Sequence, residues 1–249
     1  MALQEEMEIQ GNWLFKRRGS LPLIIIAIGL AVYLVNKYFS KSIFLNDDQY
    51  EKWYEVSCLL VSLLGQCIRI FTIGFSQTHT SGRNTASQLA ESINTKGIYS
   101  IVRHPLYLGN FFMWLGVAML TADFWFIVSF VLVYAIYYER IMFAEEQFLR
   151  KKFGDVYLEW ASKTPAFFPA FNKFQKDKRR FSWRKIFRHE KNGIAALFIL
   201  FFVFDFLGEL IISSSNYNFI LWSGCIFSVA AYLLIKYTKF NTDKLSVGN

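Results

Sequence analysis

The segment 99–110, YSIVRHPLYLGN, gathers polar side chains that can do chemistry directly before an apolar run. Pro105 lacks a backbone N–H and disfavours helical backbone at His104, so we expect a helix to begin at Pro105. The free N–H groups of its first turn attract an anion. Arg103 and His104 stand just outside that terminus, so a bound carboxylate or phosphate would meet N–H donors, a guanidinium and an imidazole. A second interpretation stays open, an ordinary membrane helix with an interfacial arginine.

The composition is that of a membrane protein. Of the 249 residues, 54% are hydrophobic and only 18% are charged, against about 25% charged residues in soluble domains. The three cysteines form no CxxC pair and no metal-ligand spacing, so we expect neither a disulfide nor a metal site. The acidic, polar N-terminus predicts no signal peptide. The net charge of +8 lies in a few segments and indicates membrane topology rather than nucleic-acid binding.

Six apolar runs predict six transmembrane helices, because a bilayer core requires about 20 apolar residues. A short helix over 85–92 and a cytoplasmic amphipathic helix over 145–160 complete the predicted all-α, polytopic fold. Basic residues are concentrated in every second segment between the spans and in both terminal segments. Because basic segments stay in the cytoplasm, both termini are expected there. The predicted spans are about 21–39, 54–75, 105–120, 124–143, 193–212 and 219–237. The chain is divided into an N-terminal part with two spans (1–75), a core (76–170), a basic loop (171–191) and a C-terminal helix pair (192–249).

A series of motifs resembles the isoprenylcysteine carboxyl methyltransferase family, membrane methyltransferases with bacterial lipid-modifying relatives. The motifs are RHPLYLG, Glu145-Glu146, Phe153-Gly154, Tyr157 and Pro165, within about 84–169. The resemblance implies S-adenosyl-L-methionine as the methyl donor and a lipid or lipidated acceptor. The positive charge of the loops places the active site on the cytoplasmic side. The membrane would be the cytoplasmic membrane of a bacterium or the endoplasmic reticulum of a eukaryote. A sulfonium is already electrophilic, so the protein has only to align the reactants and exclude water.

The resemblance also implies the residues that bind the cofactor. They comprise a loop matched by spacing alone, a tyrosine, the His-Pro-x-Tyr segment and the first of the paired glutamates. In this chain they are Glu91, Ser92, Ile93, Asn94, Tyr99, His104, Pro105, Leu106, Tyr107 and Glu145.

The acceptor side departs from the family pattern. The family has a substrate-directing arginine four residues before the first glutamate, where this chain has Ile141. Arg140 stands one residue earlier, where its side chain points about 100° away from the family position on a helix. Either Arg140 still reaches the site, or Arg103 takes the role of the family's arginine. We therefore expect Arg140 or Arg103 to act with Glu145 in catalysis. On its own helix Glu146 can pair with Arg150, which would leave Glu145 as the more available carboxylate.

Two further segments carry charge. Asp205 and Glu209 share one face of the fifth span, where they would either line a substrate path or bond to a neighbouring helix. Residues 172–191 contain nine Lys or Arg and two acids between aromatic residues, which favours anionic membrane lipids as a partner over nucleic acid.

Other functions stay open from the sequence alone. No GxGxxG motif follows a strand pattern, so a soluble Rossmann-type methyltransferase is not expected. Sterol-type reductases have a similar C-terminal motif region, which leaves an NADPH-dependent membrane reductase as an alternative. A non-catalytic membrane scaffold is another. The methyl acceptor and the oligomeric state stay open.

Overall fold

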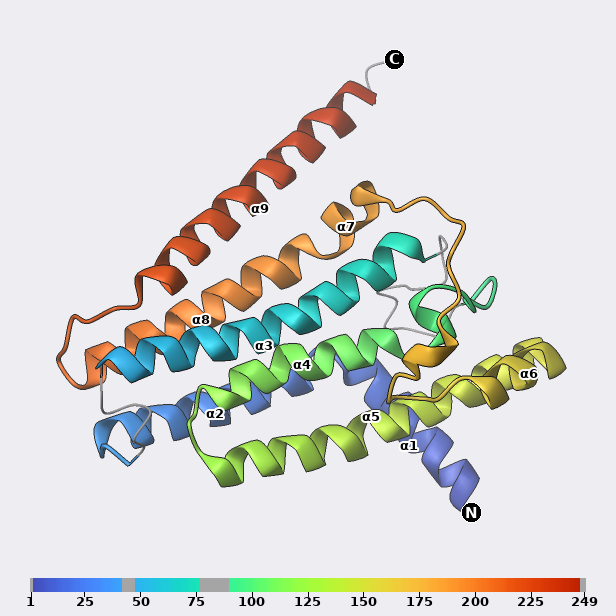
Figure 1. The fold of residues 1–249 in the computed structure, drawn as a ribbon, viewed down its shortest axis with the longest axis horizontal. Coiled ribbons are helices and arrows are strands. Elements are labelled where there is room, and N and C mark those ends of the chain that lie inside the picture. Colours follow the sequence, from blue (N-terminus) through green and yellow to red (C-terminus); the bar gives the residue numbers. More distant parts are fainter. Residues whose placement is uncertain (1, 42–47, 77–89, 247–249) are drawn as a thin grey trace.

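The computed structural model describes residues 2–41, 48–76 and 90–246 (Figure 1). Within these residues the chain is helical, with one isolated β-bridge between Gly97 and Gln175 and no strand, so the predicted all-α class is confirmed. The α-helices are α1 (Leu3–Arg17), α2 (Leu21–Tyr38), α3 (Asp48–Phe75), α4 (Pro105–Met119), α5 (Phe124–Phe153), α6 (Asp155–Lys163), α7 (Trp183–His189), α8 (Lys191–Ile211) and α9 (Phe219–Ser246). Two 3-10 helices are η2 (Ile98–Ser100) and η3 (Phe171–Lys173).

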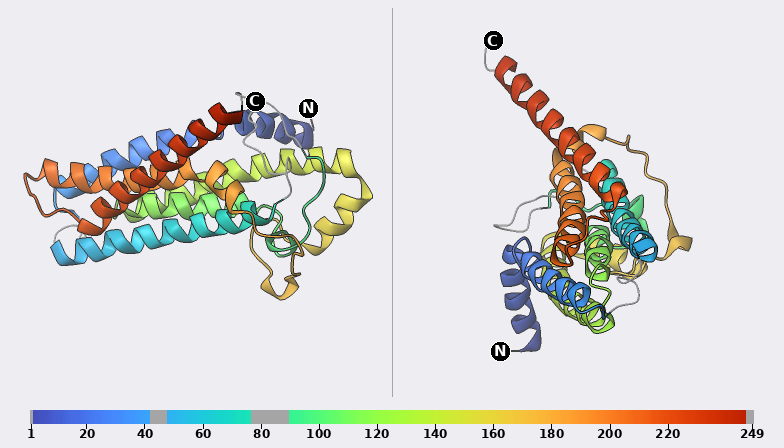
Figure 2. Two further views of the ribbon diagram at one scale, coloured as in Figure 1. Left: turned by 90° about the horizontal axis from the view of Figure 1, so that it is seen from above. Right: turned by 90° about the vertical axis from the view of Figure 1, so that its left-hand side faces the viewer.

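The long helices run between two ends of the molecule. At the left end of Figure 1, α2 ends and α3 begins, α4 is joined to α5, and α8 is joined to α9. The start of α4, together with α1, α6 and α7, lies toward the opposite end, where α9 also ends. Figure 2 shows the C-terminal part of α9 projecting away from the other helices, whereas its first part packs against α8. The start of α4, which carries the predicted site, therefore lies toward the same end of the molecule as α1 and the C-terminal end of α9.

Four helices of the described chain are long and apolar enough to cross a bilayer: Tyr50–Phe75, Phe124–Phe153, Lys191–Ile211 and Phe219–Thr238. α1 and α2 meet at a bend of 70° and count together as a fifth. α4 has 15 residues and is about 22 Å long, shorter than a hydrocarbon core of about 30 Å. The structure supports a multi-pass membrane protein, and the count of six spans stays a prediction.

Two predicted helices have different bounds. The helix expected over 145–160 is not continuous, because α5 extends to Phe153 and Gly154 breaks the chain with a positive φ of 55° before α6. Of the helix expected over 85–92, residues 91–92 form a bend and 85–89 lie outside the described residues. The paired glutamates therefore stand on an extension of the fourth apolar run rather than on a separate surface helix.

α3 and α4 pack against each other at backbone distance. A Cβ at Gly65 would lie 2.3 Å from the carbonyl oxygen of Gly109, and a Cβ at Gly116 would lie 2.1 Å from Ser62 Oγ. Only glycine fits at these crossings. Ser62 Oγ also donates a hydrogen bond of 2.8 Å to the Met113 carbonyl. These contacts fix the first turn of α4 on a rigid helix pair.

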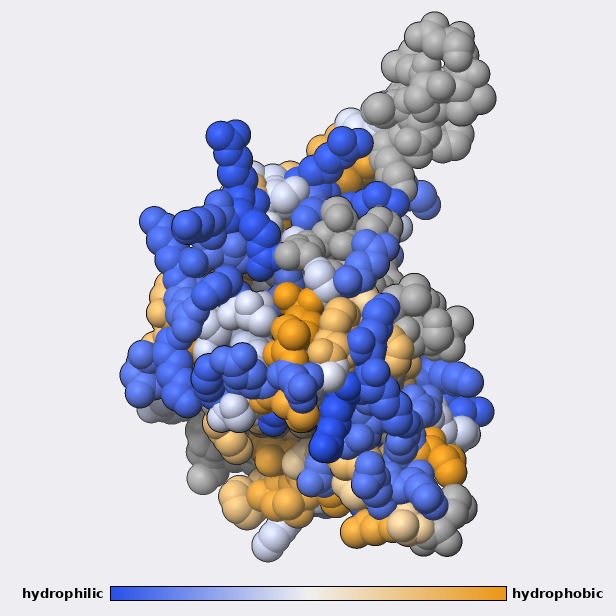
Figure 3. All heavy atoms as spheres, turned by 90° about the vertical axis from the view of Figure 1, so that its right-hand side faces the viewer, coloured by the Kyte–Doolittle hydropathy of each residue, from blue (hydrophilic) through white to orange (hydrophobic). Residues whose placement is uncertain are grey.

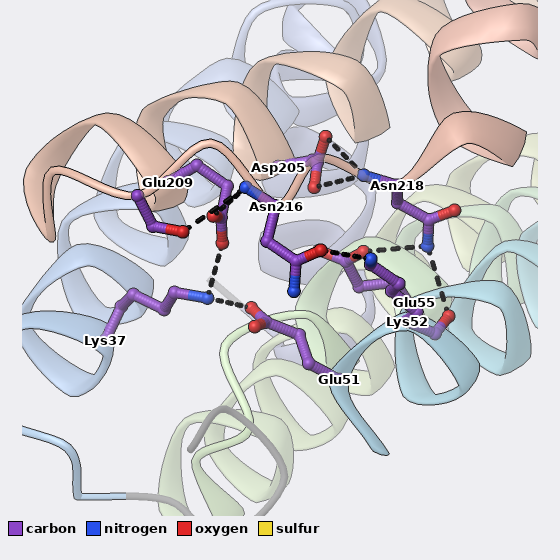
Figure 4. Close-up of polar contacts among 9 residues, drawn as sticks. Lys37, Glu51, Lys52, Glu55, Asp205, Glu209, Asn216 and Asn218 are labelled. Carbon is purple, nitrogen blue, oxygen red and sulfur yellow. Dashed lines mark hydrogen bonds and ion pairs between the residues drawn. The ribbon is translucent and has the colours of Figure 1, made fainter. Parts of the chain in front are cut away.

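A buried polar cluster joins the helices at the end remote from α6 (Figure 4). Lys37 of α2 pairs with Glu51 of α3 and, at 3.0 Å, with Glu209 of α8. Asn218, at the start of α9, donates from its backbone to Asp205 at 3.2 Å and from its side chain to Glu55 at 3.0 Å. Of the two sequence interpretations of Asp205 and Glu209, the structure shows bonding between neighbouring elements.

Candidate active site

His104 lies between the two paired glutamates at the start of α4. Its Nε2 is 2.8 Å from Glu146 Oε1, and its Nδ1 is 3.7 Å from Glu145 Oε2. The Tyr107 hydroxyl donates to the same Glu145 oxygen at 2.9 Å. Because a carboxylate only accepts hydrogen bonds, Nε2 carries a proton in this arrangement. We define the His104 cluster as five residues joined by hydrogen bonds and ion pairs: His104, Tyr107, Glu145, Glu146 and Arg103.

The backbone around Pro105 is as the sequence predicts. α4 begins at Pro105, and His104 precedes it with φ −118° and ψ 60°, outside the helical region. The backbone N–H groups of Arg103 and His104 donate to the carbonyls of Pro165 and Ala166 at 2.9 and 3.1 Å. The later Pro165 motif is therefore hydrogen-bonded directly to the RHP motif, which holds the imidazole at 7% exposure.

Glu146 is the residue that sequence reasoning left out of the site. It binds His104 and lies 3.3 Å from Arg103 Nε, and no ion pair joins it to Arg150 among the described residues. Tyr157 of α6 also bonds to it, and burial together with the Glu146 charge raises the pKa of the Tyr157 phenol. An exposed ion pair between Glu146 and Arg150 would contribute little free energy. Glu146 therefore binds His104, Arg103 and Tyr157 of other segments instead. Glu145 remains the more exposed carboxylate, at 32% against 22%.

The loop predicted to bind the cofactor is held by the basic segment. Asn94 is buried, and its side-chain oxygen accepts a hydrogen bond of 2.7 Å from Arg179 Nη1. Arg179 also pairs with Asp177, at 2.9 Å from Nε. Gly97 N donates to the Gln175 carbonyl at 2.9 Å. The segment 175–179, the strap, therefore crosses over the predicted cofactor loop, a contact that charge content did not indicate.

Tyr99 connects this loop to the His104 cluster. Burial raises the pKa of its phenol, the Glu145 carboxylate raises it further, and the Arg179 guanidinium opposes the shift. Its carbonyl accepts a hydrogen bond of 3.2 Å from Trp160 Nε1 of α6. Tyr99 is thus within electrostatic range of both Glu145 and the strap. Of the remaining predicted loop residues, Glu91 is exposed and Ser92 and Ile93 are half-buried.

The two predicted arginines have different surroundings. Ile141, at the family's arginine position, is fully buried beside Tyr107 and Tyr138. The Arg140 carbonyl faces α1, where a Cβ at Gly11 would lie only 2.1 Å away. Among the described residues, no hydrogen bond or ion pair joins Arg140 to the His104 cluster, whereas Arg103 belongs to it. The catalytic role of either arginine stays a prediction.

A second polar network adjoins the site from α3. Arg69 binds Glu190 through two hydrogen bonds of 2.9 and 2.7 Å and donates to Asn110 at 2.5 Å. Asn110 in turn donates to the Tyr138 hydroxyl at 3.4 Å, and the Tyr138 and Tyr107 rings lie 4.9 Å apart. Sequence reasoning missed this network, although an arginine inside an apolar run signals that a partner exists.

The residues present fit a sulfonium cofactor with an amino-acid tail. Glu145 offers a carboxylate to an ammonium group. The buried Arg103 Nε lies 3.3 Å from Glu146 Oε1 but makes no aligned hydrogen bond to any described residue. The neighbouring Tyr107 and Tyr138 rings suit a sulfonium cation. Within the part of the chain that the structure describes, no group of three or more His, Cys, Asp or Glu could hold a metal ion.

Fold and site together define a multi-pass helical membrane protein with a polar cluster at the start of one helix. The family model described as phospholipid methyltransferase matches residues 56–156. Protein-S-isoprenylcysteine O-methyltransferase B of Arabidopsis thaliana is 30% identical over 143 residues, which cover 55% of this chain and 71% of that protein. The chain belongs to the isoprenylcysteine carboxyl methyltransferase family.

Other relatives match over a smaller part of their length. Protein-S-isoprenylcysteine O-methyltransferase of Schizosaccharomyces pombe is 36% identical over 122 residues, 47% of this chain and 50% of that protein. The nickel-cobalt-cadmium resistance protein NccN of Alcaligenes xylosoxydans xylosoxydans is 29% identical over 129 residues, 51% of this chain and 57% of that protein. The chain thus spans about half the length of these two relatives. No solved structure matches it significantly.

Proposed function

We propose that the chain is an integral membrane methyltransferase that uses S-adenosyl-L-methionine and acts on a lipidic or lipid-anchored acceptor. The observation that carries the proposal is the His104 cluster, in which Glu145, Glu146 and Arg103 meet at the start of α4. This cluster lies inside the segment matched by the family model. Several relatives are named protein-S-isoprenylcysteine O-methyltransferases, which supports a methyl group as the transferred unit.

The residues have separate tasks in this mechanism. When bound, the cofactor supplies a methyl group on a sulfonium, so an acceptor carboxylate can form the new C–O bond while the C–S bond breaks and the sulfur keeps the electron pair. No proton has to move for such an acceptor. Glu145 holds the cofactor's ammonium group, and Glu146 orients His104. Arg103 attracts the anionic acceptor, and the wall made by 99–104 and 164–166 excludes water.

The acceptor is an isoprenylcysteine carboxylate or a lipid head group with a phosphate or amine. Ile141 in place of the family's arginine leaves the acceptor side of the cluster to Arg103 or Arg140. An anionic acceptor suits both arginines. An amine head group would require in addition that a proton leave the nitrogen, a task for His104 or Glu145.

We also propose six membrane passes, by α2, α3, α4, α5, α8 and α9, with the site and both termini in the cytoplasm. The support is that these helices run between the same two ends, and that the basic segments of the sequence gather toward the end that holds the site (Figure 1). The basic segment 172–191 would then contact anionic membrane lipids. The membrane is the cytoplasmic membrane of a bacterium or the endoplasmic reticulum of a eukaryote.

Calorimetric binding to the detergent-solubilised full chain tests the cofactor. S-adenosylmethionine and S-adenosylhomocysteine should bind, and NADPH should not. His104→Ala and Glu145→Ala should each weaken binding about tenfold or more, the loss of a hydrogen bond to a charged group. Glu139→Ala, on the exposed face of α5, is the matched control and should leave the affinity unchanged.

Other outcomes point to other classes of protein. Uptake of NADPH without either sulfur compound would replace the proposal with a membrane reductase. Silence from all three ligands in a folded protein would replace it with a scaffold. If the homocysteine product binds as expected, transfer of labelled methyl into a lipid extract and into a prenylcysteine analogue would identify the acceptor.

A further inference from the structure

A hollow of about 640 Å³ lies next to the candidate site but is separate from it. Its walls come from the loop at 95–100, from α6 with Thr164, and from residues 173–175. The predicted cofactor-binding residues are all described by the structure, and none of them lines the hollow. Thr164 of its lining directly precedes Pro165 and Ala166, whose carbonyls accept hydrogen bonds from the backbone of Arg103 and His104. The hollow is thus a space that the methyl-transfer proposal does not use.

Positive charge dominates the lining of the hollow. Its ionisable side chains are Lys96, Lys163, Lys173 and Glu159, three ammonium groups against one carboxylate. Glu159 pairs with Lys163 at 2.7 Å, and both side chains are largely exposed. Among the residues that the structure describes, the other two lysines bond to neutral oxygens alone: Lys173 to the Lys163 carbonyl at 2.7 Å and Lys96 to the Gln175 side chain.

These amines retain donors for a ligand. An ammonium group has three N–H donors, and one of them is used in each of these contacts. Lys96 and Lys173 have no carboxylate partner within the described part of the chain, and both line one hollow. Two such ammonium charges match a phosphate, whose oxygens accept several charge-assisted hydrogen bonds. The buried Thr164 and Ser100 hydroxyls add polar surface to the lining.

The surroundings of the hollow indicate where the phosphate comes from. Phe168, Phe171 and Phe174 are 60% to 82% exposed and flank Lys173 in the sequence. Rings this exposed, interleaved with lysine, are typical of a segment that enters the interfacial layer of a bilayer, where the phosphates lie. Figure 3 faces this end of the molecule and shows hydrophilic side chains framing paler and apolar surface. We propose that the hollow binds the phosphate of an anionic phospholipid head group.

Binding to the full chain in neutral detergent tests this directly, and no methyl donor is needed. Short-chain phosphatidylglycerol and phosphatidic acid should bind more tightly than phosphatidylcholine with the same acyl chains. The double variant Lys96→Gln/Lys173→Gln should weaken this binding about tenfold or more, the effect of two lost charge-assisted contacts. The matched control Lys176→Gln/Lys178→Gln removes the same charge from exposed residues that do not line the hollow. It should change the affinity less than about twofold.

A third variant is expected to tighten binding, a result that misfolding of the variant could not produce. Glu159→Gln removes the carboxylate that faces the bound anion and should tighten binding. Equal binding of phosphatidylglycerol and phosphatidylcholine would overturn the proposal, as would equal losses in the two double variants, which would indicate diffuse attraction. Inorganic phosphate and glycerol phosphate separate the two sources of phosphate. If they bind as tightly as the lipid and need the same lysines, the site takes a soluble phosphate and the lipid assignment is wrong.

Discussion

Two adjacent carboxylates have different partners because neighbouring residues on a helix point about 100° apart. Glu146 faces His104 and Arg103, whereas Glu145 faces Tyr107 and keeps more exposure. The sequence predicts a site role for Glu145 alone, as the more available carboxylate of the two, and a pairing with Arg150 for Glu146. It could not predict the partners of Glu146, because those depend on how α4 approaches the extended end of α5.

Glu146→Gln should therefore separate positioning from binding. The amide no longer attracts the imidazole and guanidinium, so we expect the methyl-transfer rate to fall about 10- to 100-fold, the equivalent of about 1.5–3 kcal/mol. The affinity for S-adenosylhomocysteine should change much less, because Glu145 and Tyr107 remain. Single-turnover kinetics and calorimetry measure the two quantities. A loss of cofactor affinity as large as the loss of rate would contradict the positioning role.

Arg103 and Arg140 can be distinguished by their effect on the acceptor. Arg103→Ala should raise the KM for an anionic acceptor about tenfold or more, because its guanidinium belongs to the His104 cluster. Arg140→Ala should have a small effect, since its helix face lies against α1. Steady-state kinetics at saturating cofactor provides the comparison. The reverse order would show that the end of α5 turns toward the site when substrate binds.

At the scale of elements, helix positions were largely predictable and contacts between segments were not. The apolar run at 193–212 predicts α8 (Lys191–Ile211) to within two residues, because length and hydropathy alone define it. The strap is different. Its bonds from Arg179 to Asn94 and from Gly97 to Gln175 join residues about 80 positions apart, and composition carries no information about such pairs.

Arg179→Ala should loosen the predicted cofactor loop. The variant loses the bond to Asn94 and the pair with Asp177, so amide hydrogen exchange at 90–97 should become faster while the core of α4 stays protected. Hydrogen–deuterium exchange with mass spectrometry reads both regions in one experiment. Arg180→Ala, an exposed neighbour, is the control. Unchanged exchange at 90–97 would show that the strap does not order this loop.

The same strap gives a pH dependence. The hydrogen bonds from Arg179 hold the pKa of Asp177 below its ordinary value of 3.8. A carboxyl group whose pKa is lower in the folded than in the unfolded state stabilises the folded state at pH values above the unfolded-state pKa. This stabilisation is lost as the pH falls through the folded-state pKa. Protection of residues 90–97 should therefore be constant from neutral pH down to about 4 and decline below that. Asp177→Asn should remove this dependence, and a decline that persists in the variant would assign it to another group.

At the scale of the whole molecule, the buried cluster around Lys37 (Figure 4) ties three helices together at the end remote from the site. The sequence marked Asp205 and Glu209 as unusual without indicating their partners, since Lys37 lies in the first predicted span and Glu51 in the polar loop before the second. The Lys37 ammonium group meets the two carboxylates only when the three helices have packed together. The side chains of Lys37, Glu51 and Glu209 are all almost fully buried.

Lys37→Met should destabilise the protein without affecting the site. Removing one partner leaves two buried carboxylates uncompensated, which costs about 3–5 kcal/mol in buried ion pairs. The midpoint of thermal unfolding in detergent should fall by several degrees, whereas Lys41→Met, exposed beyond the end of α2, should have no effect. Affinity for S-adenosylhomocysteine, measured below the transition, should stay constant. A loss of affinity at that temperature would mean that the two ends of the molecule are coupled.

The glycine crossings between α3 and α4 restrict the route by which an acceptor reaches the site. Where Gly65 meets Gly109 and Gly116 meets Ser62, the two backbones leave no room for even a methyl group. A prenyl or acyl chain cannot pass between these helices without separating a pair that extends along most of α4. If the acceptor is a lipid, as proposed, its tail would have to enter from another side of α4, toward α5 and α1. For a lipid acceptor as proposed above, access from the bilayer would therefore be asymmetric, with the flank at α3 closed.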